Sequence, residues 1–267
     1  MQIIDVGELI KAKSGKKPSR IFVYLLRKFL CVDRINSIIE KYAGKQGVDF
    51  AESVLQELHI ETSFIGLDRL PTNERFVFVS NHPLGALEAL TIGKYLSFLY
   101  PNRIKFITNE LLSYIPPLRD IFVSVAVGKG RQDKNKVLGI DKLFLSENQI
   151  VMFPSGVVSR LTDEGIQDPE WKKMFSKKAR QYSRRVVLLR SSGRCSKFFL
   201  SLSNFRKRIG IKSNIEMLLF PREMFSMQGS KIDIEVLGVF DLNSAEFSGY
   251  SDSQIAQMLR EKIYCKK

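Results

Sequence analysis

The chain has 267 residues, 44% hydrophobic and 26% charged, a composition typical of a folded globular protein and not of a disordered one. Its three cysteines are far apart and outside any Cys-x-x-Cys spacing, and it has only two histidines, which argues against a disulfide framework or a metal centre and fits a reducing cytoplasm. The formal net charge of +14 predicts a polyanionic partner: nucleic acid, an anionic lipid surface or an acidic protein.

The first region, residues 1–65, is predicted to be a helical N-terminal extension that associates with a membrane. Its first residues lack the basic-then-apolar order of a secretory signal, so we expect none. An apolar run at 21–26 is interrupted by Arg27 and Lys28, too soon for a membrane span, which needs about 20 apolar residues. A helix of this kind could lie in a membrane interface or pack on the main domain as a core helix, and both readings stay open.

Basic residues are concentrated in two stretches. Seven lie between Lys11 and Lys28 and fourteen between Lys172 and Lys212, with no acidic residue in either stretch. A charge run is ordinarily a solvated face, but two long stretches without counter-charge indicate a binding surface.

The second region, residues 66–267, is predicted to be a single α/β domain, with a largely parallel sheet flanked by helices. Short β-branched and aromatic runs alternate with helical patterns, which is the signature of parallel strands joined by helices. The predicted strands are residues 75–80, 104–107, 121–127, 149–153, 186–189, 217–220 and 232–239, and the predicted helices between them include 86–99 and 137–146.

Three loops of this domain are candidates for a functional site: residues 81–88, 128–131 and 153–160. Each follows a predicted strand, and in open α/β sheets sites collect at the carboxyl ends of the strands. The first loop places His82 directly after a strand, and Glu88 near the start of the next helix can reach back to the imidazole. A carboxylate on one ring nitrogen prepares the other to take a proton, although a structural histidine in a turn would look the same.

The third loop contains Pro154, Ser155 and Gly156, followed by Arg160. Such a turn after a buried strand can offer backbone N–H groups to an anion or oxyanion, and an arginine adds positive charge. The alternative is an ordinary tight turn.

Taken together, the first and third loops resemble the glycerolipid acyltransferase superfamily. Residues 81–88 read NHPLGALE and residues 153–156 read FPSG, which is similar to the NHPLGGLD and FPAG blocks of its hemolysin-like branch, where the ornithine- and glycine-lipid O-acyltransferases belong. The similarity extends to residues 47–50, 166–175, 214–217 and 221–225, and therefore spans most of the chain.

The resemblance implies a reaction and its participants. His82 would be the general base, oriented by Glu88, that moves a fatty acyl group from an acyl carrier protein or coenzyme A thioester to the hydroxyl of a lyso-ornithine or lyso-glycine lipid. No metal or other cofactor is expected. The protein would act peripherally at the cytoplasmic face of the inner membrane, on an anionic surface. Substrate-binding residues would be Asn81, Gly85, Lys129, Arg131, Phe153, Pro154, Ser155, Gly156 and Arg160.

The chain departs from the superfamily pattern in ways that leave other functions open. Glu88 stands where this branch has Asp, and only Lys129 and Arg131 replace the usual charged second block. Ser155 stands where the phosphate-acceptor enzymes have Glu, which favours an amino-acid lipid over lysophosphatidate. The alternatives are a 1-acylglycerol-3-phosphate acyltransferase, a non-catalytic basic membrane protein and a nucleic-acid-binding protein. We expect no nucleic-acid partner, because no known binding module is recognisable.

Overall fold

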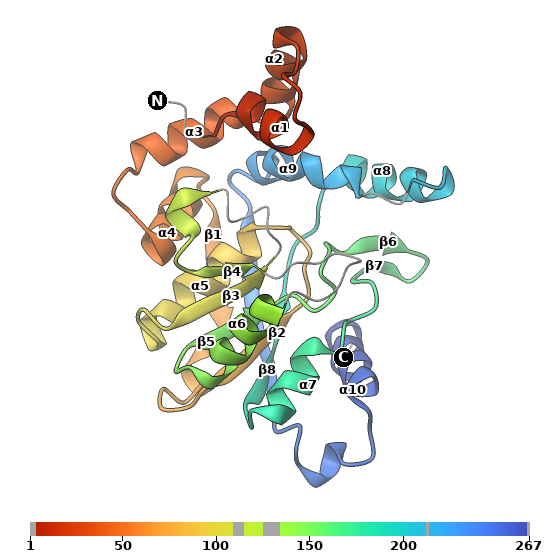
Figure 1. The fold of residues 1–267 in the computed structure, drawn as a ribbon. Coiled ribbons are helices and arrows are strands. Elements are labelled where there is room, and N and C mark those ends of the chain that lie inside the picture. The colour runs from red at the N-terminus through yellow and green to blue at the C-terminus, as the bar shows by residue number, and fades with distance from the viewer. Residues whose placement is uncertain (1–3, 109–114, 125–133, 212–213, 266–267) are drawn as a thin grey trace.

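The computed structural model describes residues 4–108, 115–124, 134–211 and 214–265, and it is organised around one seven-stranded sheet (Figure 1). The strand order is β1-β9-β8-β2-β5-β3-β4, and β6 and β7 form a separate hairpin. The strands are β1 (Glu61–Ile65), β2 (Phe76–Ser80), β3 (Ile104–Thr108), β4 (Phe122–Ser124), β5 (Gln149–Met152), β6 (Arg160–Thr162), β7 (Gly165–Gln167), β8 (Arg185–Ser191) and β9 (Lys231–Phe240). The α-helices are α1 (Val6–Ser14), α2 (Arg20–Phe29), α3 (Val32–Lys41), α4 (Gly47–Glu57), α5 (Leu87–Leu99), α6 (Lys134–Leu145), α7 (Met174–Gln181), α8 (Lys197–Arg208), α9 (Phe220–Ser226) and α10 (Asp252–Tyr264). Short 3₁₀ helices are η1 (Leu67–Arg69), η3 (Pro116–Leu118), η4 (Ile215–Leu219) and η5 (Ala245–Phe247).

The sheet is largely parallel, as predicted. Neighbouring strands run parallel from β8 through β2, β5 and β3 to β4, and β1 runs parallel to β9. Strand β9 lies antiparallel to β8. The α/β class with helices on both faces is confirmed.

Strand β2 shows how the two faces are built. All five of its residues are buried, and successive side chains of a strand point to opposite faces. Phe76 and Phe78 join the hydrophobic cluster formed with α3, α4 and α5, whereas Val77 and Val79 join the cluster formed with α6, α7 and α10. A strand packed on both faces belongs at the centre of a sheet, and its end is therefore a rigid platform for the residues that follow.

One predicted strand is wrong. Residues 217–220 lie instead in η4 and at the start of α9. A four-residue apolar run cannot be told from a buried helical segment by its pattern. Pro221 in the first turn of α9 decides the outcome here, because proline lacks the N–H that a central strand needs and its fixed φ suits a helix start.

Two other predictions fall near the edges of described segments. Strand β4 covers the start of the predicted strand 121–127, whose last residues lie outside the described part of the chain. Strand β1 lies just before the proposed boundary at residue 65 and joins the sheet beside β9. The division of the chain at that boundary stays a prediction.

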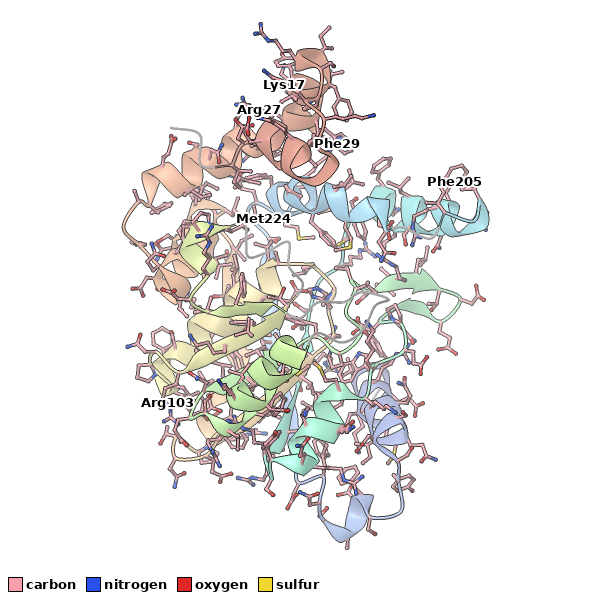
Figure 2. The ribbon with its side chains drawn as sticks, viewed as in Figure 1. Lys17, Arg27, Phe29, Arg103, Phe205 and Met224 are labelled. Atoms are coloured by element: carbon pink, nitrogen blue, oxygen red, sulfur yellow. The ribbon has the colours of Figure 1, made fainter. Side chains whose placement is uncertain are left out.

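The apolar run near the N-terminus forms α2, and no residue of this helix is buried. Val23 and Leu26 are half-buried, and none of its apolar side chains is packed in the core, so the reading of a core helix does not hold. Five large apolar side chains are exposed: Ile21, Phe22, Tyr24, Leu25 and Phe29. Figure 2 labels Lys17, Arg27 and Phe29 at this end of the molecule. None of the helices described is both long and apolar enough to cross a bilayer.

Candidate active site

The first and third predicted loops lie side by side because they follow adjacent parallel strands. Val79 of β2 is paired with Met152 of β5, so that both chains leave the sheet at the same edge. His82 and Phe153 follow these strands, and their rings stack with centroids 4.3 Å apart and planes 22° from parallel. The sheet register thus brings together two blocks of sequence about 70 residues apart.

The imidazole of His82 is held by Glu88, as the sequence suggested. Nδ1 lies 2.8 Å from Oε1 of Glu88, whose side chain is fully buried, whereas the His82 side chain keeps 15% of its surface exposed. A carboxylate accepts hydrogen bonds, so Nδ1 carries the proton and Nε2 is left as the acceptor. Among the described residues, none hydrogen-bonds to Nε2, which is therefore available to a substrate hydroxyl.

The backbone of the turn also fixes Glu88. Its Oε1 accepts hydrogen bonds from the N–H groups of Leu84 at 3.0 Å and Gly85 at 3.1 Å. Glu88 lies in the first turn of α5, where the helix dipole also favours a negative charge. The extra methylene of glutamate, relative to the aspartate of the similar enzymes, is accommodated without loss of the contact to His82.

Gly85 is required by both its conformation and its surroundings. Its φ of +85° lies in the left-handed region, and a Cβ there would lie 2.9 Å from the ring of Phe220. A larger residue would displace the turn that holds Glu88.

The nearby Cys195 is not a candidate nucleophile. Its thiol donates to the carbonyl of Pro83, and burial raises the pKa of this thiol, so that it stays protonated.

Asp168 is a residue of the site that the sequence analysis did not identify. Its Oδ1 accepts from the His82 N–H at 3.1 Å and from the Ser159 hydroxyl at 2.6 Å, and its Oδ2 accepts from Trp171 Nε1 at 2.8 Å. It thus ties the backbone of His82 to the third loop. Its position inside the matched segment 166–175, three residues before the single tryptophan, was the available signal.

The predicted binding residues of the third loop lie next to His82, and several of their polar groups are engaged within the protein. The Gly156 N–H donates to the Phe153 carbonyl at 2.9 Å, and the Ser155 hydroxyl donates to the Val157 carbonyl at 2.7 Å. Pro154 accepts from the Lys172 N–H at 3.0 Å. These contacts shape a rigid turn, and its role in binding substrate stays a prediction.

Two other predicted site residues, Asn81 and Arg160, are buried and form hydrogen bonds within the protein. Asn81 is buried and exchanges two hydrogen bonds with the backbone of Ser191, so it joins the ends of β2 and β8. Arg160 is also buried, and it donates to Glu216 at 2.6 Å. Lys129 and Arg131 lie outside the described residues.

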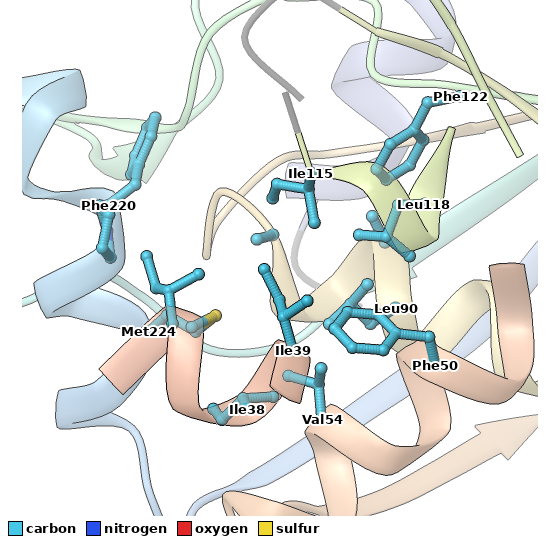
Figure 3. Close-up of a pocket in the computed structure, with 14 residues that line it drawn as sticks. Ile38, Ile39, Phe50, Val54, Leu90, Ile115, Leu118, Phe122, Phe220 and Met224 are labelled. Atoms are coloured by element: carbon cyan, nitrogen blue, oxygen red, sulfur yellow. The ribbon is translucent and has the colours of Figure 1, made fainter. Parts of the chain in front are cut away.

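Ala86, in the same loop as His82 and Glu88, lines an apolar cavity. Figure 3 shows this cavity with its lining side chains. The cavity is small. Its volume is about 140 Å³ and its lining is hydrophobic throughout. The lining residues come from α3, α4, α5, α9 and the η3–β4 segment: Ile35, Ile38, Ile39, Phe50, Val54, Ala86, Ala89, Leu90, Ile115, Leu118, Phe122, Phe220, Pro221 and Met224. Ala86 directly follows Gly85, and the ring of Phe220 lies next to that glycine, so the cavity adjoins the loop that carries His82 and Glu88.

The arrangement suits proton transfer next to a hydrocarbon chain. A buried carboxylate prepares one histidine nitrogen to accept a proton, and an apolar cavity adjoins the loop that carries both side chains. Within the described part of the chain, no three His, Cys, Asp or Glu side chains lie together as metal ligands would.

Comparison with known proteins places this geometry in context. The model of an acyltransferase family matches residues 11–267. The lyso-glycine lipid O-acyltransferase of Phocaeicola vulgatus is 36% identical over 225 residues, which cover 83% of this chain and 80% of that protein. The enzyme of the same name from Bacteroides thetaiotaomicron is 36% identical over 227 residues, which cover 84% of this chain and 83% of that protein. The crystal structure of the 1-acyl-sn-glycerophosphate acyltransferase of Thermotoga maritima aligns with a TM-score of 0.48 and 16% identity, over 99% of this chain and 91% of that one.

Proposed function

This chain belongs to the acyltransferase family, and we propose that it transfers a fatty acyl group to the hydroxyl of a lyso-lipid, with His82 as the general base. The observation that carries the proposal is the 2.8 Å contact between Nδ1 of His82 and the buried carboxylate of Glu88, beside an apolar cavity. Acceptors of the lyso-glycine lipid type are favoured by the names of two relatives that match more than four-fifths of the chain.

The reaction proceeds in two steps at Nε2. The hydroxyl oxygen of the acceptor attacks the carbonyl carbon of an acyl thioester while Nε2 takes the hydroxyl proton. The carbon–sulfur bond then breaks, and the imidazolium returns the proton to the departing thiolate. Glu88 orients the ring and stabilises the imidazolium between the two steps.

The donor is an acyl carrier protein or coenzyme A thioester. Both are anionic, and the exposed basic residues of the second basic stretch supply positive charge at the surface: Lys172, Lys173, Lys177, Arg194, Lys197 and Arg208. The apolar cavity beside the catalytic turn would hold a stretch of an acyl chain, since its lining offers only hydrophobic contacts.

The protein works as a peripheral protein at the cytoplasmic face of the inner membrane, with α2 on an anionic surface. Helix α2 combines exposed apolar side chains with the basic residues of the N-terminal stretch, which is the pattern of an interfacial helix. Binding to vesicles with phosphatidylglycerol should weaken by about 1 kcal/mol for each basic residue replaced in this stretch. The residues to replace are Lys16, Lys17, Arg20, Arg27 and Lys28. Equal binding to neutral and anionic vesicles would contradict this assignment.

The decisive experiment compares the two histidines of the chain. Purified wild type, His82→Asn and His59→Asn are assayed for acyl transfer from acyl carrier protein to lyso-glycine lipid, lyso-ornithine lipid and lysophosphatidate. Loss of a general base lowers kcat by about two to four orders of magnitude, which is the result expected for His82→Asn. His59 is exposed and has a φ of +50°, which asparagine tolerates, so the control should retain wild-type turnover.

The outcomes separate the candidate functions. Turnover of lysophosphatidate alone would move the assignment to a 1-acylglycerol-3-phosphate acyltransferase. Undiminished transfer by His82→Asn would remove the general base from the mechanism. A wild-type protein with no transfer to any of the three acceptors, from acyl carrier protein or from coenzyme A thioesters, would leave a non-catalytic membrane protein.

A further inference from the structure

The outer face of α8 carries a row of exposed aromatic and aliphatic side chains. Phe198 is 60% exposed, Phe205 58% and Ile209 54%. The first two are seven residues apart and the third follows four residues later, so they lie along one side of the helix and its C-terminal end. We refer to Phe198, Phe205 and Ile209 as the outer row of α8. A row of large apolar residues in water marks a surface that contacts something else.

The opposite side of α8 attaches the helix to the protein. The ring of Phe199 is fully buried and stacks on Phe220 at 5.3 Å, and Leu200 and Ser203 are buried with it. Arg206 is buried in an ion pair with Glu216, 2.8 Å between Nε and Oε2. Because these contacts hold the helix in place, the outer row is not needed for folding.

The exposed charges on α8 and on the segment that leads into it are positive, whereas the exposed Asp163 and Glu164 lie in the turn of the neighbouring β6–β7 hairpin. Arg194, Lys197 and Arg208 are exposed, and no acidic residue occurs between Lys172 and Lys212. The first acidic residue beyond that stretch, Glu216, is buried and paired with two arginines. An apolar row bordered by exposed cations is typical of a helix that lies in the interface of an anionic bilayer.

The location of α8 relates it to α2 and to the cavity. Figure 1 draws α1, α2, α3, α8 and α9 at one end of the molecule, and Figure 2 labels Phe29 of α2 and Phe205 of α8 at that end. Phe220 connects the two features, because it packs under α8 through Phe199 and also lines the cavity. Met224, one turn further along α9, lines the cavity as well.

We propose that the outer row of α8 is a second membrane contact, which inserts into an anionic bilayer together with α2. This inference rests on the proposed function, in which the acceptor is a lipid. With both helices on the surface, the end of the molecule that contains α9 and the cavity faces the bilayer, and an acyl chain passes between membrane and cavity without crossing water. The apolar nature of the row favours a bilayer over an acidic carrier protein, which charge alone would attract.

The first test measures binding to vesicles of phosphatidylcholine with and without phosphatidylglycerol. Replacing Phe198, Phe205 and Ile209 together by serine should lower the partition coefficient on anionic vesicles by about ten- to a hundredfold, because three apolar side chains no longer enter the bilayer. The matched control replaces two equally exposed residues, Phe98 and Leu145, near the C-terminal ends of α5 and α6, and should bind like wild type.

The second test measures how deeply a side chain of α8 inserts into the bilayer. Phe205→Trp, Phe22→Trp and Phe98→Trp are compared in vesicles that contain brominated lipids, which quench a tryptophan inside the hydrocarbon. The native Trp171 is buried and gives a constant background. Quenching of Phe205→Trp and Phe22→Trp, but not of Phe98→Trp, is the expected result. Quenching of Phe22→Trp alone would overturn the proposal and leave α2 as the contact.

Assays of turnover separate this proposal from the proposed function. The triple serine variant should acylate a short-chain, water-soluble lyso-lipid at the wild-type rate and lose turnover on vesicles. A variant that binds vesicles normally but loses affinity for acyl carrier protein would identify the outer row as a protein-docking surface and overturn the proposal. If the wild type showed no acyl transfer at all, the quenching result would still decide whether α8 contacts the bilayer.

Discussion

Glu88 and Glu216 are both fully buried glutamates, yet their surroundings differ. Glu216 lies between the guanidinium groups of Arg160 and Arg206, which remain charged under all ordinary conditions. Glu88 is held by two backbone N–H groups and by the imidazole of His82, whose charge changes with a single proton. The first arrangement fixes structure. The second can take part in a reaction, because its counter-charge appears and disappears.

The ion pairs of Glu216 with Arg160 and Arg206 place two guanidinium groups in the protein interior. Burial lowers the pKa of Arg160, because the protein interior disfavours its charge, and the carboxylate of Glu216 acts in the opposite direction. Without Glu216, two cations would remain in the interior with little compensation. The comparison therefore predicts that changes at Glu216 act on stability and changes at Glu88 act on catalysis.

The largest expected effect is at Glu216. Glu216→Gln should lower the free energy of unfolding by about 3–5 kcal/mol, because it leaves Arg160 and Arg206 buried without a counter-charge. Urea denaturation measures the change, and the exposed Glu246→Gln is the control, expected within about 0.5 kcal/mol of wild type. A stable Glu216→Gln protein would mean that the cluster is not structural and would break the comparison.

The next effect is at Glu88 and is catalytic. Glu88→Gln keeps an oxygen for the Leu84 and Gly85 N–H groups but no longer stabilises an imidazolium, so kcat should fall about a hundredfold. Glu88→Asp keeps the charge and should recover part of the rate. Steady-state kinetics and denaturation are measured on the same samples. A loss of rate that only follows a loss of folded protein would place Glu88 with Glu216.

Much of the turn that holds His82 and Glu88 could be predicted from the sequence, because its interactions are local or follow from the order of the strands. Glu88 lies six residues after His82, and a strand-to-helix turn brings the two together. Phe153 meets His82 because β5 is the neighbour of β2 in the sheet. That the two strands are neighbours was a reasonable expectation, since both are buried strands of one α/β domain.

What could not be predicted depends on contacts between distant segments. The sequence suggested that Arg160 supplies positive charge to an anion site. Instead its guanidinium forms an ion pair with Glu216, which lies 56 residues further along the chain. Asp168 accepts from the His82 backbone 86 residues earlier, and no local pattern indicates such a bond. The antiparallel position of β9 and the cavity between α3, α5 and α9 arise only when the whole sheet is assembled.

The third prediction concerns Asp168, which extends the comparison of Glu88 and Glu216 to a buried carboxylate whose hydrogen-bond donors are neutral. Asp168→Asn presents an amide N–H₂ to donors that need an acceptor, His82 N–H and Ser159 on one side or Trp171 on the other. The free energy of unfolding should fall by about 1–3 kcal/mol. Because Asp168 touches only the backbone of His82, kcat should change less than in Glu88→Gln. The exposed Asp163→Asn is the control, and a greater kcat loss than that of Glu88→Gln would contradict this order.

The smallest effect concerns Tyr100, a buried group whose hydroxyl donates to a neutral carbonyl, that of Pro71, at 2.7 Å. Burial raises its pKa to about 12, so the folded protein retains the phenol proton that an unfolded tyrosine loses near pH 10. Stability from this group is complete below pH 10 and is lost as the pH rises towards 12. The free energy of unfolding should therefore be about 1 kcal/mol lower at pH 11 than at pH 9 because of Tyr100. Tyr264, whose pKa burial also raises, adds a change of the same sign that persists in Tyr100→Phe. If urea denaturation gave Tyr100→Phe the same pH dependence as wild type, burial beside a neutral carbonyl would not be what retains this proton, and the effect would belong to other groups such as Tyr264.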